Sequence, residues 1–134
     1  MRKSLLIVAT SCNILMTSND ATSSRKLSSS KCEIDGRIFL IDLFLMSNGC
    51  FINISESAEP RIGAITLSVK SSQGVSTSAL LPDKRGSVFS SMIGELLAER
   101  TKGIVVASLY LREELDVNSM KTLINEVRKL SERD

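Results

Sequence analysis

The chain has 134 residues, which is the size of one domain and enough to bury a core without disulfides or a metal. Its 43% hydrophobic and 24% charged residues are typical of an ordinary soluble globular protein and argue against a disordered or fibrous class. The 17 basic and 15 acidic residues leave a net charge of +2, so the concentrated basic surface of a nucleic-acid-binding protein is not expected.

Histidine is absent, and this excludes the Ser-His-Asp and Cys-His arrangements of nucleophilic catalysis. The three cysteines, Cys12, Cys32 and Cys50, are odd in number and widely spaced. They match neither a disulfide framework nor a CxxC metal site. We therefore predict three reduced thiols in a cytosolic protein.

The first residues, MRKSLLIVA, have the pattern of a secretory signal peptide. Arg2 and Lys3 precede a short apolar run over residues 5–9. This run is too short to span a bilayer, and polar residues interrupt the apolar sequence after it. The segment is either a working leader or a dispensable extension, and the sequence leaves both open.

Residues 17–31 are almost entirely polar, with three consecutive serines. Such a segment has too few apolar side chains to offset the entropy lost on ordering. We predict that residues 1–31 are a disordered or leader segment and that residues 32–134 form a single folded domain. Removing residues 1–30 should then leave stability and partner binding unchanged.

Four segments with alternating apolar and polar residues come next along the chain, and each indicates a strand with one buried face. They comprise residues 32–46, 50–55, 62–69 and 75–81. An Asn-Gly pair and the segment KSSQG supply the turns of two hairpins. Four sequential strands joined by short connections predict an antiparallel β-meander.

Two of these strands carry further information. Residues 39–46 are apolar on both faces except at Asp42, which predicts a strand that is covered on both sides or bulged. A lone carboxylate such as Asp42 is more typical of an edge or bulge than of catalysis. In the third strand the two sides differ, with Ile65, Leu67 and Val69 on one and Ala64, Thr66 and Ser68 on the other.

A helix, a strand and a second helix complete the predicted fold. Ser87 is a suitable N-cap for the first helix, and Leu97 lies on its apolar face. Gly103 ends that helix, and residues 104–111 form an apolar strand. Asp116 caps the last helix. The predicted order is ββββαβα, an α+β domain.

Motifs for chemistry are weak in this sequence. The segment PDKRGS joins a strand to a helix, but it has one glycine and no GK[ST], so a solvated loop or a protein contact is favoured over a phosphate site. The acidic pairs at positions 95 and 99 and at 113 and 114 are typical of a solvated charged surface. We predict no catalytic residue, no cofactor-binding residue and no metal site.

The second half of the chain resembles the proteasome assembly chaperone four family. In that family a Ser/Thr-rich strand ending in two leucines precedes a helix that ends in Leu-Ala-x-Arg/Lys-Thr, then an apolar strand and a C-terminal helix. The stretches VSTSALL and SSMIGELLAERTKGIVVASLYL have this order. The matching positions are Val75, Ser76, Thr77, Ser78, Leu80, Leu81, Leu97, Ala98, Arg100 and Thr101. The element order agrees over residues 33–130.

The resemblance implies a non-enzymatic chaperone of the cytoplasm or nucleus, without cofactors. Family members pair with the third assembly chaperone as a heterodimer and help to build the ring of proteasome α subunits. No contact with nucleic acid or membrane is implied. Polar segments beside the helix and strand can contact a partner without disturbing the core, so the predicted interface residues are Lys84, Arg85, Arg112, Glu113 and Glu114.

Two other functions are compatible with the residues alone. A secreted or lipid-anchored small protein-binding domain would explain MRKSLLIVA as a working signal. A small-molecule enzyme is the other alternative, although no motif in the chain indicates its chemistry.

Overall fold

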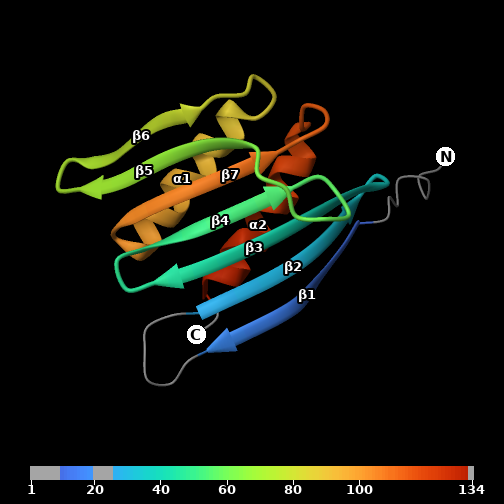
Figure 1. The fold of residues 1–134 in the computed structure, drawn as a ribbon, viewed down its shortest axis with the longest axis horizontal. Coiled ribbons are helices and arrows are strands. Elements are labelled where there is room, and N and C mark those ends of the chain that lie inside the picture. Colours follow the sequence, from blue (N-terminus) through green and yellow to red (C-terminus); the bar gives the residue numbers. More distant parts are fainter. Residues whose placement is uncertain (1–9, 20–25, 133–134) are drawn as a thin grey trace.

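A seven-stranded sheet with the strand order β1-β2-β3-β4-β7-β5-β6 organises the chain (Figure 1). The computed structural model describes residues 10–19 and 26–132. Its strands are β1 (Thr10–Asn19), β2 (Lys26–Ile34), β3 (Arg37–Met46), β4 (Gly49–Ser55), β5 (Ala64–Ser71), β6 (Gly74–Leu81) and β7 (Ile104–Tyr110). The helices are α1 (Ser87–Thr101) and α2 (Val117–Glu132). The predicted α+β class is confirmed.

The β-meander predicted from the sequence is interrupted by β7. The hairpins β3–β4 and β5–β6 are antiparallel, as predicted. However, β7 lies between them, parallel to β4 and antiparallel to β5. Because α1 carries the chain back along the sheet before β7 begins, β7 can run parallel to β4. Its apolar side chains favour this central position, where Val105 and Leu109 are buried.

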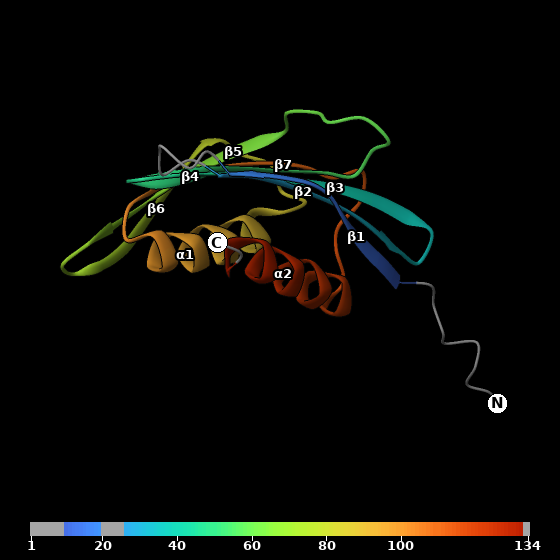
Figure 2. The same cartoon turned by 90° about the horizontal axis from the view of Figure 1, so that it is seen from below.

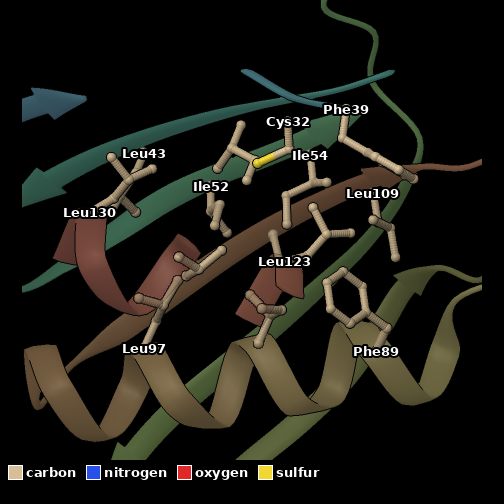
Figure 3. Close-up of a cluster of buried hydrophobic side chains, with 14 of the residues drawn as sticks. Cys32, Phe39, Leu43, Ile52, Ile54, Phe89, Leu97, Leu109, Leu123 and Leu130 are labelled. Atoms are coloured by element: carbon tan, nitrogen blue, oxygen red, sulfur yellow. The ribbon is translucent and has the colours of Figure 1, made fainter. Parts of the chain in front are cut away.

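Both helices cover the same face of the sheet (Figure 2). Helix α1 packs on β5 and β7, and α2 packs on β2 and β3. Figure 3 shows the buried side chains between these layers, among them Phe39, Leu43, Ile52, Ile54, Phe89, Leu97, Leu109, Leu123 and Leu130. The predicted burial of Leu97 is confirmed, since none of it is exposed (0%). Neither helix is long and apolar enough to span a bilayer.

Of the two predicted helix N-caps, the one at α2 is confirmed and the one at α1 is wrong. At α2 the backbone N–H of Ser119 donates to Oδ1 of Asp116 over 3.2 Å, so the predicted cap is confirmed. At α1 the N-cap is Gly86, which has no side chain, and Ser87 is already the first helical residue. Further along α1, Gly94 lies directly against Ser68 of β5, where a Cβ atom would collide with the hydroxyl. The absent side chain lets this helix approach the sheet closely.

The folded domain does not start near Cys32, as predicted, because strands β1 and β2 include residues before it. Strand β2 pairs with β3 from Lys26 to Ile34, and β1 pairs with β2 in turn. The backbone ladder and the cover of α2 order this polar segment, and Ser28 and Ser30 are buried. We therefore expect removal of residues 1–30 to destabilise the fold. Positions 1–9, with the signal-like run, lie outside the described residues.

The prediction of three reduced cysteines is also wrong. Cys12 of β1 lies opposite Cys32 of β2, and the two form a disulfide. This pairing results from the register of two strands, which spacing along the sequence does not reveal. Cys50 is a free thiol, and its burial raises the pKa to about 12.

Candidate interaction surface

Both helices lie on one side of the sheet, and no helix of the described residues covers the other side, which is termed the open face (Figure 2). The open face carries apolar side chains, among them half-exposed Phe51. Strand β5 shows this most clearly. Ser68 is 1% exposed and lies under α1, whereas Val69 on the other side of the strand is 37% exposed. The helix therefore covers the hydroxyl-bearing side of β5, and the side with Ile65 and Leu67 belongs to the open face.

Five apolar side chains form a continuous row across the open face. Directly paired positions link β2, β3, β4, β7 and β5 in that order. The row, termed the apolar row, comprises Leu27, Phe44, Phe51, Val106 and Leu67. Directly opposite side chains in a sheet lie close enough to pack against each other. Phe51 at the centre is 50% exposed, and the other four are partly exposed. The row is therefore a partly exposed apolar patch, and such patches occur at protein interfaces.

A polar row lies beside the apolar row. Ser29 donates a 2.6 Å hydrogen bond to Asp42, and Asp42 is paired with Asn53. Ser108 is the next member, on β7, and accepts a hydrogen bond from the backbone of Gly63 at 2.9 Å. The prediction that Asp42 marks an edge or bulge is wrong, because β3 is an interior strand whose pairing with both neighbours is continuous.

Between the two rows the open face has a hollow of about 370 Å³. Apolar residues line most of it, namely Phe44, Phe51, Ile52, Ile62, Ile65 and Val106, and Asp42, Asn53 and Ser108 complete it. Oδ1 of Asn53 is buried but has no hydrogen-bond partner among the described residues. A buried carbonyl oxygen without a donor is costly, so a partner that supplies an N–H or O–H there would gain binding energy.

The loop between β4 and β5 rises on the side of the sheet away from the helices (Figure 2), and its Ile62 lines the hollow. Ile62 in this loop is 76% exposed. Beside it, the Arg61 guanidinium stacks 5.6 Å from the centre of the Tyr110 ring. The open face is thus bordered by an exposed apolar residue and a charged one, as expected at the margin of a protein interface.

An ion pair fixes the end of the sheet next to this loop. Arg37 contacts Glu56 at 2.7 Å and also donates to the backbone carbonyls of Glu113 and Glu114. The backbone N–H of Arg112 donates to Glu56 at 2.8 Å. Burial alone would raise the pKa of Glu56, but hydrogen bonds from Arg37 and from the backbone lower it overall. The hydrogen bond and charge of Glu56 raise the pKa of Arg37.

The predicted interface residues lie on two neighbouring loops at this end. The Arg85 guanidinium donates to the carbonyl of Leu111 over 3.4 Å, so the loop before α1 adjoins the loop after β7. Lys84, Arg112, Glu113 and Glu114 are exposed with it. The structure brings these residues to one end of the molecule, and their role at an interface stays a prediction.

Sequence reasoning missed the apolar row, although two signals for it were present. One was the apolar side of β5 with Ile65 and Leu67, and the other was the two-sided apolar run over residues 39–46. A strand with two apolar faces is expected to be covered twice. Here the helices cover one face only, and the other apolar face has no helix of the described residues over it.

The comparisons with known proteins bear on the fold. No family model matches the chain, and no curated protein matches it by sequence. It superposes on a chain of a crystal structure described as a novel chaperone complex for yeast 20S proteasome assembly. The TM-score is 0.57 at 13% identity, over 93% of this chain and 95% of that chain. The two chains share a fold. At 13% identity the likeness concerns architecture alone.

Proposed function

We propose that the protein is a non-enzymatic assembly chaperone that acts as half of a heterodimer and binds proteasome α subunits during assembly of the 20S core particle. The observation that carries this proposal is the apolar row, centred on half-exposed Phe51, on a fold shared with a proteasome assembly chaperone complex. The family resemblance of the second half of the sequence supports the same function. The proposed location is the cytoplasm or nucleus.

The open face is the proposed surface for the second chaperone, of the third-chaperone type. Covering Phe51 and the neighbouring row removes apolar surface from water, which is the main driving force for a lasting association. Asp42 and Asn53 in the adjacent polar row provide hydrogen-bond acceptors. They favour a partner whose N–H or O–H groups lie opposite these oxygens. The mechanism is therefore shape and hydrogen-bond complementarity, without covalent chemistry.

The α subunit is proposed to bind elsewhere, at the loop before α1 and the loop after β7, together termed the end loops. These loops carry Lys84, Arg85 and Arg112. These side chains are exposed and lie beyond the strands that form the apolar row. A partner on the open face leaves them accessible. Charged groups at such a margin mainly accelerate association and select partners, which suits a chaperone that must later release its client.

Affinity purification of the tagged chain from its own cells tests the proposal. We expect the wild type to recover a second small chaperone and α subunits, both identified by mass spectrometry. The double variant Phe51→Ser, Val106→Ser should lose the second chaperone. Val88→Ser is the matched control, because Val88 is 65% exposed on α1, on the helical side of the sheet. A wild-type sample without any proteasome subunit would refute the proposed function.

A secreted or lipid-anchored binding domain is the second candidate, and the disulfide favours it. Bonds such as Cys12–Cys32 persist mainly in oxidising compartments. The apolar row would then bind an extracellular protein. The mass of the N-terminal peptide of the native protein separates the two candidates. Removal of the signal-like run would support secretion, and retention of Met1 or its simple excision would support the chaperone.

A further inference from the structure

Three side chains that could bind a metal ion meet outside the open face. Cys12 comes from β1, Cys32 from β2 and Glu126 from α2. The two sulfur atoms and a carboxylate oxygen all lie within 4.8 Å of one another. Ser30, two residues before Cys32, donates a 2.8 Å hydrogen bond to Glu126. Figure 3 shows Cys32 among the buried side chains between the sheet and the helices.

Glu126 is a buried carboxylate in an otherwise largely apolar layer. It is 5% exposed, and no salt bridge to it is found in residues 10–19 and 26–132. Buried charges in proteins are generally paired with an opposite charge or bound to a metal. The hydrogen bond from Ser30 satisfies part of the carboxylate but supplies no positive charge. The environment of Glu126 therefore favours a cation.

We propose that reduction of the Cys12–Cys32 disulfide creates a site for a Zn²⁺-like divalent cation, bound by both thiolates and by Glu126. Thiolate and carboxylate ligands are typical of zinc, with metal distances of about 2.3 Å to sulfur and about 2.0–2.2 Å to oxygen. Tetrahedral sulfur ligands at that distance lie about 3.8 Å apart. Sulfurs in a disulfide are about 2 Å apart, so after reduction the two side chains must move apart to reach this spacing. The carboxylate oxygen already lies within 4.8 Å of both sulfurs. Water completes the fourth position.

The reaction balances with a dithiol as the reductant. The dithiol gives two electrons and two protons to the disulfide, which becomes two thiols, and the reductant becomes a disulfide itself. Binding of the cation then displaces the two thiol protons to solvent. Cys12 is only half-buried, so the reductant and the ion can reach the site from its side.

The two forms are mutually exclusive, but each connects β1 to β2. The disulfide forms that connection in the oxidised protein, and the metal with its two thiolates forms it in the reduced protein. The ion would also supply the positive charge that Glu126 lacks. The chain would thus keep its N-terminal strand in place under oxidising and reducing conditions.

Cobalt uptake by the full-length protein tests the site, because Co²⁺ bound to thiolates absorbs visibly and Zn²⁺ displaces it. Protein reduced with a dithiol, then freed of reductant without oxygen, should bind about one Co²⁺ per chain. Oxidised protein should show no thiolate band. Glu126→Gln removes a charged ligand and should weaken binding by at least the roughly 10–100-fold that loss of an outer-shell partner costs. Cys12→Ser should abolish the band. Cys50→Ser is the matched control and should keep it, since Cys50 is the free cysteine outside the cluster.

Several results would overturn the proposal. One is a reduced wild type that takes up no Co²⁺ at micromolar concentration. Another is equal uptake by Cys12→Ser and the wild type, and a third is a band that disappears in Cys50→Ser while circular dichroism shows a folded chain. A reduced wild type that unfolds with or without the ion would also overturn it, because the ligands come from three packed elements. The comparison of oxidised with reduced wild type requires no variant.

Discussion

The two faces of the sheet carry similar apolar side chains but are covered very differently. On the helical face Leu43 has no exposed surface (0%), whereas Phe51 on the open face is 50% exposed. In β5, helix α1 covers the polar side of the strand. On that side the hydroxyl oxygens of Ser68 and Thr77 are hydrogen-bonded at 2.8 Å. Packing within the chain thus buries one face and leaves apolar side chains of the other exposed, which is the observation behind the proposed association.

Replacing Leu97 by alanine tests the packing of the helical face. Among the predictions it should have the largest effect on the free energy of unfolding. Leu97 is fully buried between α1 and the sheet, so the variant loses buried apolar surface and leaves a cavity. We expect the free energy of unfolding to fall by about 2–5 kcal/mol. Urea denaturation measures it, and Met92→Ala on the exposed side of α1 is the control. An unchanged midpoint would mean that the helical face is not the stable core.

Acid titration examines the end of the sheet, where Arg37 and Glu56 join β3 to the loops. Because the folded state lowers the pKa of Glu56, its contribution is present above the unfolded pKa of about 4.3. The contribution is lost as the pH falls through the lower folded value. At pH 7 we expect Glu56→Gln to cost about 1.5–3 kcal/mol, the range for hydrogen bonds to charged groups. Denaturation from pH 7 to 3 should show this difference shrinking, and a constant difference would contradict the assignment.

Replacing Phe51 by serine examines the open face in the isolated chain. Since Phe51 is half-exposed and covered by no helix, we expect a loss of about 1 kcal/mol or less in unfolding free energy. Association with the proposed second chaperone should change far more than stability, and sedimentation of mixtures of the two chains should detect less complex. A loss as large as that of Leu97→Ala would place Phe51 in the core and remove the difference between the faces.

Reversing two charges at the end loops should change stability least. Lys84→Glu with Arg85→Glu alters exposed side chains, so the unfolding free energy should shift by less than about 0.5 kcal/mol. Capture of an α-subunit intermediate should become slower and less dependent on salt. Association kinetics at two salt concentrations measure this. Equal rates for the variant and the wild type would exclude these two residues from the interface.

Local features of the sequence were sufficient for the β3–β4 and β5–β6 hairpins, the two helices and the burial of Leu97. The single strand predicted over residues 32–46 was wrong, because a turn at Asp35 and Gly36 divides it between β2 and β3. Turn residues and side-chain periodicity act over a few positions, so they can be interpreted without knowing distant contacts. Asp116 is an example, because its cap depends on a residue three positions away. The charged end-loop residues were also identified as exposed, although their binding role is untested.

Tertiary structure decided the features that depend on distant pairing. Period-two alternation shows that Leu67 and Ser68 point to opposite sides of β5, but only the packing of α1 decides which side is covered. Likewise, the polar sequence of β2 has little tendency to order alone and becomes a strand because β1 and β3 complete its hydrogen bonds. The same register places Cys12 opposite Cys32. These outcomes depend on contacts between distant segments, and the pattern within one segment does not contain them.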